Sequence, residues 1–202
     1  MLPSGPVKSF SRSIAFVKAP LVSASIRTFP SALCSFPHAA ITNGSLTDGD
    51  KLPSVDLYEN SPASKVNIAE LNAGKKVIIF GVPGAFTPGC SKTHLPGYVS
   101  DFDKFKSKGV DEIVCVSVND PFVMAAWGKE HSADGKVRML ADTNGAFTKA
   151  RDLEKDLTGP LGSIRCQRFS MLVEDGVVKT ANGEPDGTGL TCSLTNSLLS
   201  QL

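Results

Sequence analysis

Apolar residues in this chain gather in short runs that are bounded by glycine, proline, asparagine and aspartate. Short runs rich in valine, isoleucine and phenylalanine are typical of buried β-strands. Asp175-Gly176 separates two of these runs and is a strong signal for a β-hairpin. The predicted strands are 77–82, 112–118, 137–142, 166–175 and 177–181.

Between the strands, the apolar spacing changes to the period of a helix. Tyr98, Phe102 and Phe105 lie at positions i, i+4 and i+7, which predicts a helix over 90–108. Pro96 lies inside that span and should kink the helix or delay its start, because its ring removes a backbone donor. Further helices are predicted over 67–71, from Pro121, over 146–153, and in a C-terminal segment that includes Cys192.

The order of these elements predicts an α/β protein. Strands first alternate with helices, which favours parallel crossovers, and the late hairpin adds antiparallel strands. This order is typical of a thioredoxin-like fold, with a central mixed sheet and helices on both faces. The sequence contains no internal repeat, no GxGxxG after a strand and no Walker motif, so nothing in it indicates nucleotide binding.

The first 44 residues differ in composition from the rest. No acidic residue precedes Asp48, and serine is frequent. The basic residues of this segment are Lys8, Arg12, Lys18 and Arg27. Basic, serine-rich, acid-free and amphipathic composition is typical of a mitochondrial transit peptide. We therefore expect residues 1–44 to be a disordered transit peptide and residues 45–202 to form the globular domain.

Charge and the C-terminus bear on location and partners. The net charge of +1 gives no argument for a nucleic-acid partner, and no stretch approaches the roughly 18 apolar residues of a membrane span. The final Ser200-Gln201-Leu202 resembles the peroxisomal Ser-Lys-Leu address. We expect a mitochondrial protein that also reaches peroxisomes and the cytoplasm.

Candidate chemistry is concentrated in PGAFTPGC, residues 83–90. A strand that ends in a tight loop and continues into a helix places Cys90 in the first turn, where unpaired N–H groups and the helix dipole favour a thiolate. The hydroxyl of Thr87 can reach the sulfur or an oxygen bound beside it. Pro83 and Pro88 stiffen the loop and are expected to shield the sulfur from water.

The spacing Pro83-x-x-x-Thr87-x-x-Cys90 resembles the active-site motif of the peroxiredoxin family. The strings RFSM (168–171) and EPDGTGLTCSL (184–194) resemble the atypical two-cysteine members, and the likeness covers nearly all of 48–202. It implies a thiol-dependent peroxidase that reduces hydrogen peroxide, alkyl hydroperoxides and peroxynitrite and is regenerated by thioredoxin. It implies no cofactor and no metal. We expect a monomer or a weak homodimer.

The resemblance also implies roles for individual residues. Cys90 would be the peroxidatic thiolate, and Thr87 would hydrogen-bond the thiolate and the peroxide. Arg168 would keep the thiolate charged and polarise the O–O bond, with Pro83 as a shield. The product would be a sulfenic acid on Cys90, which is the first step of thiol oxidation.

A second cysteine is needed to resolve that sulfenic acid. Cys192 matches the family tail, and an intramolecular Cys90–Cys192 disulfide is implied. Cys115 is the competing candidate, but it lies in an apolar run where a cysteine is more often part of the core. Cys166 lies two residues before Arg168, so on one strand the two side chains would share a face. Cys166 would then lie near the active site, or it would be an incidental semi-buried thiol.

Other functions have weaker support. Cys90 and His94 have a spacing that can hold a metal, but zinc requires three or four protein ligands and no second cluster supplies them. A Cys-His hydrolase would require an orienting acid that is not evident, so His94 is expected to be structural or solvent-facing. Phe122, Met124 and Trp127 are expected to be core residues. The alternative class is a non-enzymatic module that senses peroxide.

Overall fold

The computed structural model describes residues 47–202, so the predicted transit peptide lies outside the described residues. Seven strands form one sheet in the order β2-β1-β5-β4-β3-β8-β9, and β6 and β7 form a separate hairpin. The strands are β1 (Asp56–Glu59), β2 (Lys65–Asn67), β3 (Lys76–Gly81), β4 (Glu112–Ser117), β5 (Arg138–Ala141), β6 (Glu154–Leu157), β7 (Ser163–Cys166), β8 (Phe169–Glu174) and β9 (Val177–Gly183).

The main sheet is mixed, as predicted. Strands β3, β4 and β5 are parallel neighbours, whereas β1, β8 and β9 are antiparallel to the strands beside them. Near the end of β3, Phe80 pairs with Cys115 of β4 on one side and with Ser170 of β8 on the other. The end of β3 is therefore held between two strands, and the loop that follows it has a firm base.

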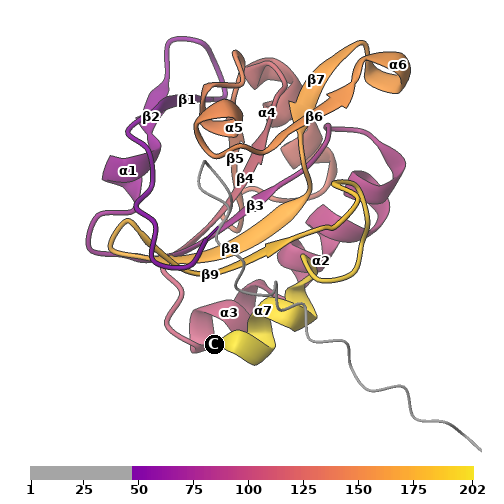
Figure 1. Cartoon of the computed structure of the whole chain (residues 1–202). Coiled ribbons are helices and arrows are strands. Elements are labelled where there is room, and N and C mark those ends of the chain that lie inside the picture. Colours follow the sequence, from indigo (N-terminus) through magenta and orange to yellow (C-terminus); the bar gives the residue numbers. More distant parts are fainter. Residues whose placement is uncertain (1–46) are drawn as a thin grey trace, which may run out of the picture. The chain divides into compact units, whose positions relative to one another are not determined.

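Helices cover both faces of this sheet, which confirms the predicted α/β class. Helices α2, α3, α4 and α7 contribute to one core cluster, and α1 and α5 contribute to the other. Figure 1 shows α2, α3 and α7 grouped on one side of β8 and β9. The helices are α1 (Ile68–Leu71), a π-helix (Cys90–His94), α2 (Leu95–Ser100), α3 (Phe102–Ser107), α4 (Pro121–Glu130), α5 (Ala146–Ala150), α6 (Thr158–Leu161) and α7 (Thr195–Gln201).

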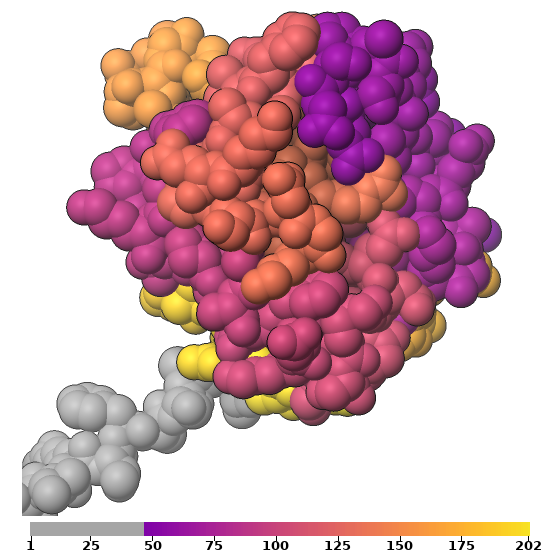
Figure 2. Space-filling model, turned by 180° about the vertical axis from the view of Figure 1, so that it is seen from behind, coloured from indigo at the N-terminus to yellow at the C-terminus, as the bar shows by residue number. Residues whose placement is uncertain are grey.

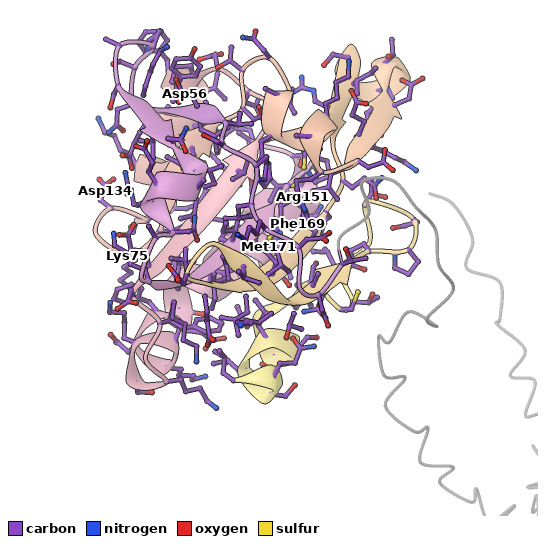
Figure 3. The ribbon with its side chains drawn as sticks, turned by 60° about the vertical axis from the view of Figure 1, so that its left-hand side comes forward. Asp56, Lys75, Asp134, Arg151, Phe169 and Met171 are labelled. Atoms are coloured by element: carbon purple, nitrogen blue, oxygen red, sulfur yellow. The ribbon has the colours of Figure 1, made fainter. Side chains whose placement is uncertain are left out.

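The continuous apolar run of β3 is explained by burial on both faces. Ile78 and Phe80 belong to the cluster under α2 and α4, whereas Val77 and Ile79 belong to the cluster under α1 and α5. Side chains alternate between the faces of a strand, so a strand that is covered on both sides needs apolar residues at every position. In Figure 3, Phe169 and Met171 of β8 lie close together, and both belong to the second cluster.

The helix predicted over 90–108 is divided into the π-helix, α2 and α3. The backbone N–H of Leu95 donates to the carbonyl of Cys90, five residues earlier, and Pro96 follows at the start of α2. Proline has no N–H and clashes with the carbonyl four residues before it, so a wider turn accommodates it. Pro96 thus shapes the segment that carries Cys90.

Three details differ from the sequence predictions. Helix α7 begins at Thr195, so Cys192 lies in the preceding loop and not in the helix. Leu194, directly before the helix, has an extended backbone (φ −75°, ψ 161°), so the helix does not continue towards the N-terminus. The strand predicted over 166–175 is interrupted, because Cys166 ends β7 and β8 starts at Phe169. Phe122 is 63% exposed, although Met124 and Trp127 are buried as predicted.

The β6–β7 hairpin was not predicted, because its strands are short and largely polar. It carries the α6 turn, which projects at the upper right of Figure 1 and protrudes from the surface seen in Figure 2. Strands β1 and β2 were missed for the same reason. Within the described part of the chain, no helix is long and apolar enough to cross a membrane.

Candidate active site

The loop after β3 is held in place by contacts with the neighbouring strands. A Cβ atom on Gly81 would lie 2.1 Å from the Phe169 ring, so only glycine allows β3 and β8 to approach here. The side-chain oxygen of Asn119, just beyond β4, accepts a hydrogen bond from the N–H of Ala85 at 3.0 Å. β3 therefore lies close against β8 where the loop begins, and the loop itself is hydrogen-bonded to the segment that follows β4.

Thr87 and the prolines have separate roles in this loop. The Thr87 hydroxyl donates to the carbonyl of Gly84 at 2.9 Å, and its own carbonyl accepts from the N–H of Ser91 at 2.9 Å. The hydroxyl therefore donates within the loop, and its expected contact with the sulfur or a bound oxygen stays a prediction. Pro83 is buried, whereas Pro88 is exposed, so of the two only Pro83 can exclude water.

Cys90 is the first residue of the π-helix, and its side chain is fully buried. Its sulfur lies 3.4 Å from Nη1 of Arg168, which donates a hydrogen bond to it. The neighbouring Ser91 hydroxyl accepts from the indole N–H of Trp127 at 2.9 Å. The contact places a positive charge directly beside the sulfur, in the position of a charge-assisted hydrogen bond.

Arg168 lies between β7 and β8 and is 3% exposed. Its Nε donates to the carbonyl of Thr188 at 3.1 Å, and its backbone N–H donates to the carbonyl of Gly187 at 2.7 Å. Its carbonyl accepts from the N–H of Glu184 at 3.0 Å. The loop after β9 therefore fixes both the backbone and the guanidinium of Arg168, which leaves Nη1 directed at Cys90.

His94 lies beside this site, and of the two roles expected for it, structural or solvent-facing, burial and hydrogen bonding support the structural one. Its ring is 1% exposed, and Nε2 lies 3.1 Å from the carbonyl of Ser193. A carbonyl only accepts, so Nε2 must carry the proton and Nδ1 must accept from Arg168 Nη1 at 3.2 Å. Burial, together with the charge of Arg168, lowers the pKa of His94 to about 3. The ring is therefore neutral at physiological pH.

Mild acidification is expected to destabilise the protein through His94. Its pKa is about 3 when folded, against an ordinary value of 6.5, so the unfolded chain binds an additional proton between these values. The free energy of unfolding should fall as the pH drops below about 6.5, with a slope approaching about 1.4 kcal/mol per pH unit. Urea unfolding at several pH values between about 6.5 and 5 measures this slope. Most carboxylates titrate below this interval, so they contribute little to it.

The matched comparison is His94→Gln against His131→Gln. The first variant should lose most of the slope, and the second, which removes a histidine at the end of α4, should keep it. A slope in His94→Gln that equals that of the wild type would contradict a buried neutral ring.

Cys192 lies in the loop between β9 and α7. Its thiol donates to the carbonyl of Gly183 at 3.3 Å, and the side chain is 5% exposed. The carbonyl of the next residue, Ser193, accepts from both His94 Nε2 and the Tyr98 hydroxyl, the latter at 2.8 Å. The segment that carries Cys192 is thus attached to the helical segment that carries Cys90.

The other two cysteines in the described range, Cys115 and Cys166, are both fully buried thiols. Cys115 lies in the centre of β4, and burial raises its pKa well above the ordinary range, with the nearby Cys90 adding to the effect. Cys166 belongs to the opposite core cluster from Cys90, and burial raises its pKa to about 12. The shared face that we expected for Cys166 and Arg168 is absent, because the strand is interrupted between them.

The site combines three groups around Cys90 with a second thiol nearby. A buried thiol, a buried guanidinium and a neutral imidazole meet at the end of a central strand, and a second thiol lies in the loop that holds the guanidinium. Among residues 47–202, no group of three or more His, Cys, Asp or Glu side chains is placed to hold a metal ion. Such an arrangement can stabilise a thiolate and the negative oxygen that leaves when a thiolate attacks an O–O bond.

Comparisons with known proteins agree with this chemistry. The model of the Redoxin family matches residues 47–199, so the chain belongs to the Redoxin family. Peroxiredoxin-2E, a chloroplastic protein of Arabidopsis thaliana, is 40% identical over 210 residues, which cover 98% of this chain and 89% of the relative. Within the family the protein is a peroxiredoxin, a thiol-dependent peroxidase with a thioredoxin-like fold.

Solved structures place it in the same group. Reduced Prx3 of Vibrio vulnificus in complex with hydrogen peroxide superimposes with a TM-score of 0.72 and 45% identity, covering 77% of this chain and 98% of that one. Peroxiredoxin 5 of Alvinella pompejana gives a TM-score of 0.68 and 44% identity, with coverage of 77% and 98%. The predicted likeness to peroxiredoxins, with a peroxiredoxin 5 among the similar structures, and the predicted peroxidase activity are confirmed.

Proposed function

We propose that Cys90 is the peroxidatic residue and that Arg168 activates it. The observation that carries the proposal is the buried contact of 3.4 Å between Arg168 Nη1 and the Cys90 sulfur. The thiolate attacks one peroxide oxygen, the S–O bond forms, and the O–O bond breaks. Cys90 becomes a sulfenic acid, and the departing hydroxide or alkoxide takes up a proton to give water or an alcohol. Arg168 stabilises the negative charge on that leaving oxygen.

Thr87 and Pro83 complete the peroxide site in this proposal. The Thr87 hydroxyl donates to the carbonyl of Gly84, so it must release that bond before it can donate to the thiolate or to a bound peroxide. The buried Pro83 keeps water from the sulfur, which preserves the strength of the charge contacts around it. The substrates we propose are hydrogen peroxide, alkyl hydroperoxides and peroxynitrite.

We further propose that Cys192 resolves the sulfenic acid. Its thiol attacks the Cys90 sulfur, the S–S bond forms, and the S–O bond breaks, with the hydroxyl leaving as water. The two thiols of thioredoxin then reduce the disulfide. Cys115 is a poorer resolving residue, because burial within β4 raises the pKa of its thiol and fixes its backbone in the sheet.

Turnover with thioredoxin tests this assignment. In a coupled assay with thioredoxin reductase and NADPH, Cys192→Ser should lower peroxide turnover by roughly 10²-fold, because it removes an intramolecular thiol with a high effective concentration. Cys115→Ser is the control and should retain turnover. Mass spectrometry of peroxide-treated wild type should show a Cys90–Cys192 linkage. Full turnover by Cys192→Ser together with a Cys90–Cys115 linkage would reverse the assignment.

We propose that residues 1–44 direct the domain at 45–202 to an organelle. Their basic, serine-rich composition supports this, and the alignment with a relative named chloroplastic extends over 98% of this chain. Mitochondria are the proposed destination, with Ser200-Gln201-Leu202 allowing a peroxisomal fraction and an uncleaved form remaining cytoplasmic. Microscopy of fluorescent fusions to 1–44 tests this, and accumulation in plastids alone would contradict it. In solution the proposed state is a monomer or a weak homodimer.

A further inference from the structure

The loop that carries Cys192 is gathered around one buried carboxylate, that of Glu184. This residue follows β9 directly and is 3% exposed. Its oxygens accept from the N–H and hydroxyl of Thr191 at 2.8 and 2.6 Å. They also accept from the N–H and hydroxyl of Ser193 at 3.0 and 2.7 Å. Glu184 therefore holds the residue on each side of Cys192 by two hydrogen bonds.

The other side of the same loop is attached to the peroxide site. The Ser193 carbonyl accepts from His94 and Tyr98, so the N–H, the hydroxyl and the carbonyl of Ser193 are all in use. In Figure 1 the yellow loop that precedes α7 runs close to α2, in agreement with these contacts. Cys192 is thus fixed by its neighbours on both sides.

The two thiols are engaged with different groups in this state. Cys90 contacts Arg168, and Cys192 donates to the carbonyl of Gly183. A disulfide requires Cα atoms within roughly 7 Å and a defined dihedral angle between the two Cβ–S bonds. Each thiol must leave its present partner, and Thr191 and Ser193 must loosen from Glu184 when the backbone of Cys192 moves.

We propose that Glu184 is a latch that restrains Cys192 in the reduced protein and limits the rate at which it condenses with the Cys90 sulfenic acid. This rests on the proposed function, in which Cys192 is the resolving residue. Glu184 is a positioning residue, since it contacts neither thiol and acts through Thr191 and Ser193. In the limited step, the Cys90 S–O bond breaks, the S–S bond forms, and the Cys192 proton leaves with the hydroxyl as water.

The restraint depends on the charge of the carboxylate. Burial raises the pKa of Glu184, but the hydrogen bonds from Thr191 and Ser193 outweigh it and leave the pKa below its ordinary value. The group is therefore ionised at neutral pH, and hydrogen bonds to an ionised acceptor are the strong kind. Glutamine has the same shape but is uncharged, and its NH₂ group faces donors that need an acceptor.

The latch also affects overoxidation. A sulfenic acid that waits for Cys192 can react with a second peroxide to give a sulfinic acid, which thioredoxin does not reduce. A slower condensation step therefore makes the protein more sensitive to high peroxide. Weakening the latch should accelerate disulfide formation and protect Cys90 from sulfinic acid.

Stopped-flow fluorescence can separate the two steps in one experiment. Trp127 is the only tryptophan in the chain, and its indole donates to Ser91, next to Cys90. Mixing reduced protein with hydrogen peroxide should give a first phase, proportional to peroxide, and a second phase, independent of it. In Glu184→Gln we expect the second phase to be about tenfold faster, which corresponds to about 1.4 kcal/mol. Mass spectrometry should find less Cys90 sulfinic acid at high peroxide.

Further variants separate a latch from a general loss of structure. The double variant Thr191→Val/Ser193→Ala removes only the two hydroxyl donors to Glu184. It should accelerate the second phase to a smaller extent than Glu184→Gln does. It replaces Glu184→Gln as the test if that variant does not fold. Glu174→Gln is the matched control, because its carboxylate pairs with Lys76 at the far end of β8, and it should leave both phases as in wild type.

The outcomes distinguish the latch from the proposed function. A Cys90–Cys192 disulfide that forms no faster in Glu184→Gln and in the double variant than in wild type would overturn the latch and leave the assignment of Cys192 intact. Wild-type protein that forms no Cys90–Cys192 disulfide would overturn that assignment, and the latch with it.

Discussion

Replacing Cys90 with serine is expected to abolish peroxide reduction, with a loss of at least about 10⁴-fold in the second-order rate constant. Serine occupies nearly the same space, so the buried site should remain folded. Its hydroxyl does not ionise at physiological pH, and an alcohol attacks a peroxide oxygen far more slowly than a thiolate does. The rate of peroxide loss under pseudo-first-order conditions, measured on Cys90→Ser and wild type, gives the result directly.

Cys166→Ala is the control for this prediction. It also removes a fully buried thiol, but from the core cluster on the opposite face of the sheet. Its rate constant should stay near that of the wild type, although the small cavity can lower stability. If peroxide reduction persisted in Cys90→Ser and were lost in Cys166→Ala, Cys90 would not be the reacting thiol and the reaction would lie on the opposite face of the sheet.

Arg168→Met should lower the rate constant for Cys90 oxidation by about 10²- to 10³-fold. Methionine fills much of the same volume but removes the hydrogen bond to the sulfur and the positive charge beside the leaving oxygen. It also leaves His94 Nδ1 without its donor, since Arg168 Nη1 is shared between the sulfur and the ring. The effect should therefore exceed that expected for loss of a single neutral hydrogen bond.

Two comparisons test the role of the guanidinium. Arg168→Lys keeps the charge but cannot reach the sulfur, His94 and Thr188 at once, so it should recover only part of the rate. Arg151→Met is the matched control, because Arg151, which is labelled in Figure 3, is also buried but donates to Asp50 and not to the sulfur. Equal rate losses in Arg151→Met and Arg168→Met would indicate a general loss of stability.

The loop and its cysteine were predictable because their signals are local. An apolar run, two prolines and a helical spacing beyond Cys90 are all found within 77–108. Such neighbouring residues favour one local backbone conformation, and the structure has the strand, the loop and the helical start at Cys90 where they were predicted. Local signals failed for β1, β2, β6 and β7, where pairing with a partner strand stabilises short segments of weak propensity.

The partners of His94 could not be predicted because they are distant in the sequence. His94 is 74 residues from Arg168 and 99 residues from Ser193, and its spacing from Cys90 alone indicates only a shared helix face. Glu184 was recognised only as part of a family-like tail. Its four hydrogen bonds depend on the way the loop closes after β9, which no periodic pattern describes.

The sequence by itself determined the class of fold, the stiff loop after the central strand and the thiol that it presents, because each depends on short-range propensity and burial. The motif likeness added the pairing of Cys90 with Arg168, 78 residues away. Only the tertiary structure decided how that contact is held, through a neutral His94 and the Ser193 carbonyl. It also placed Cys192 in a loop around a buried carboxylate, since those contacts depend on the register of β3, β8 and β9.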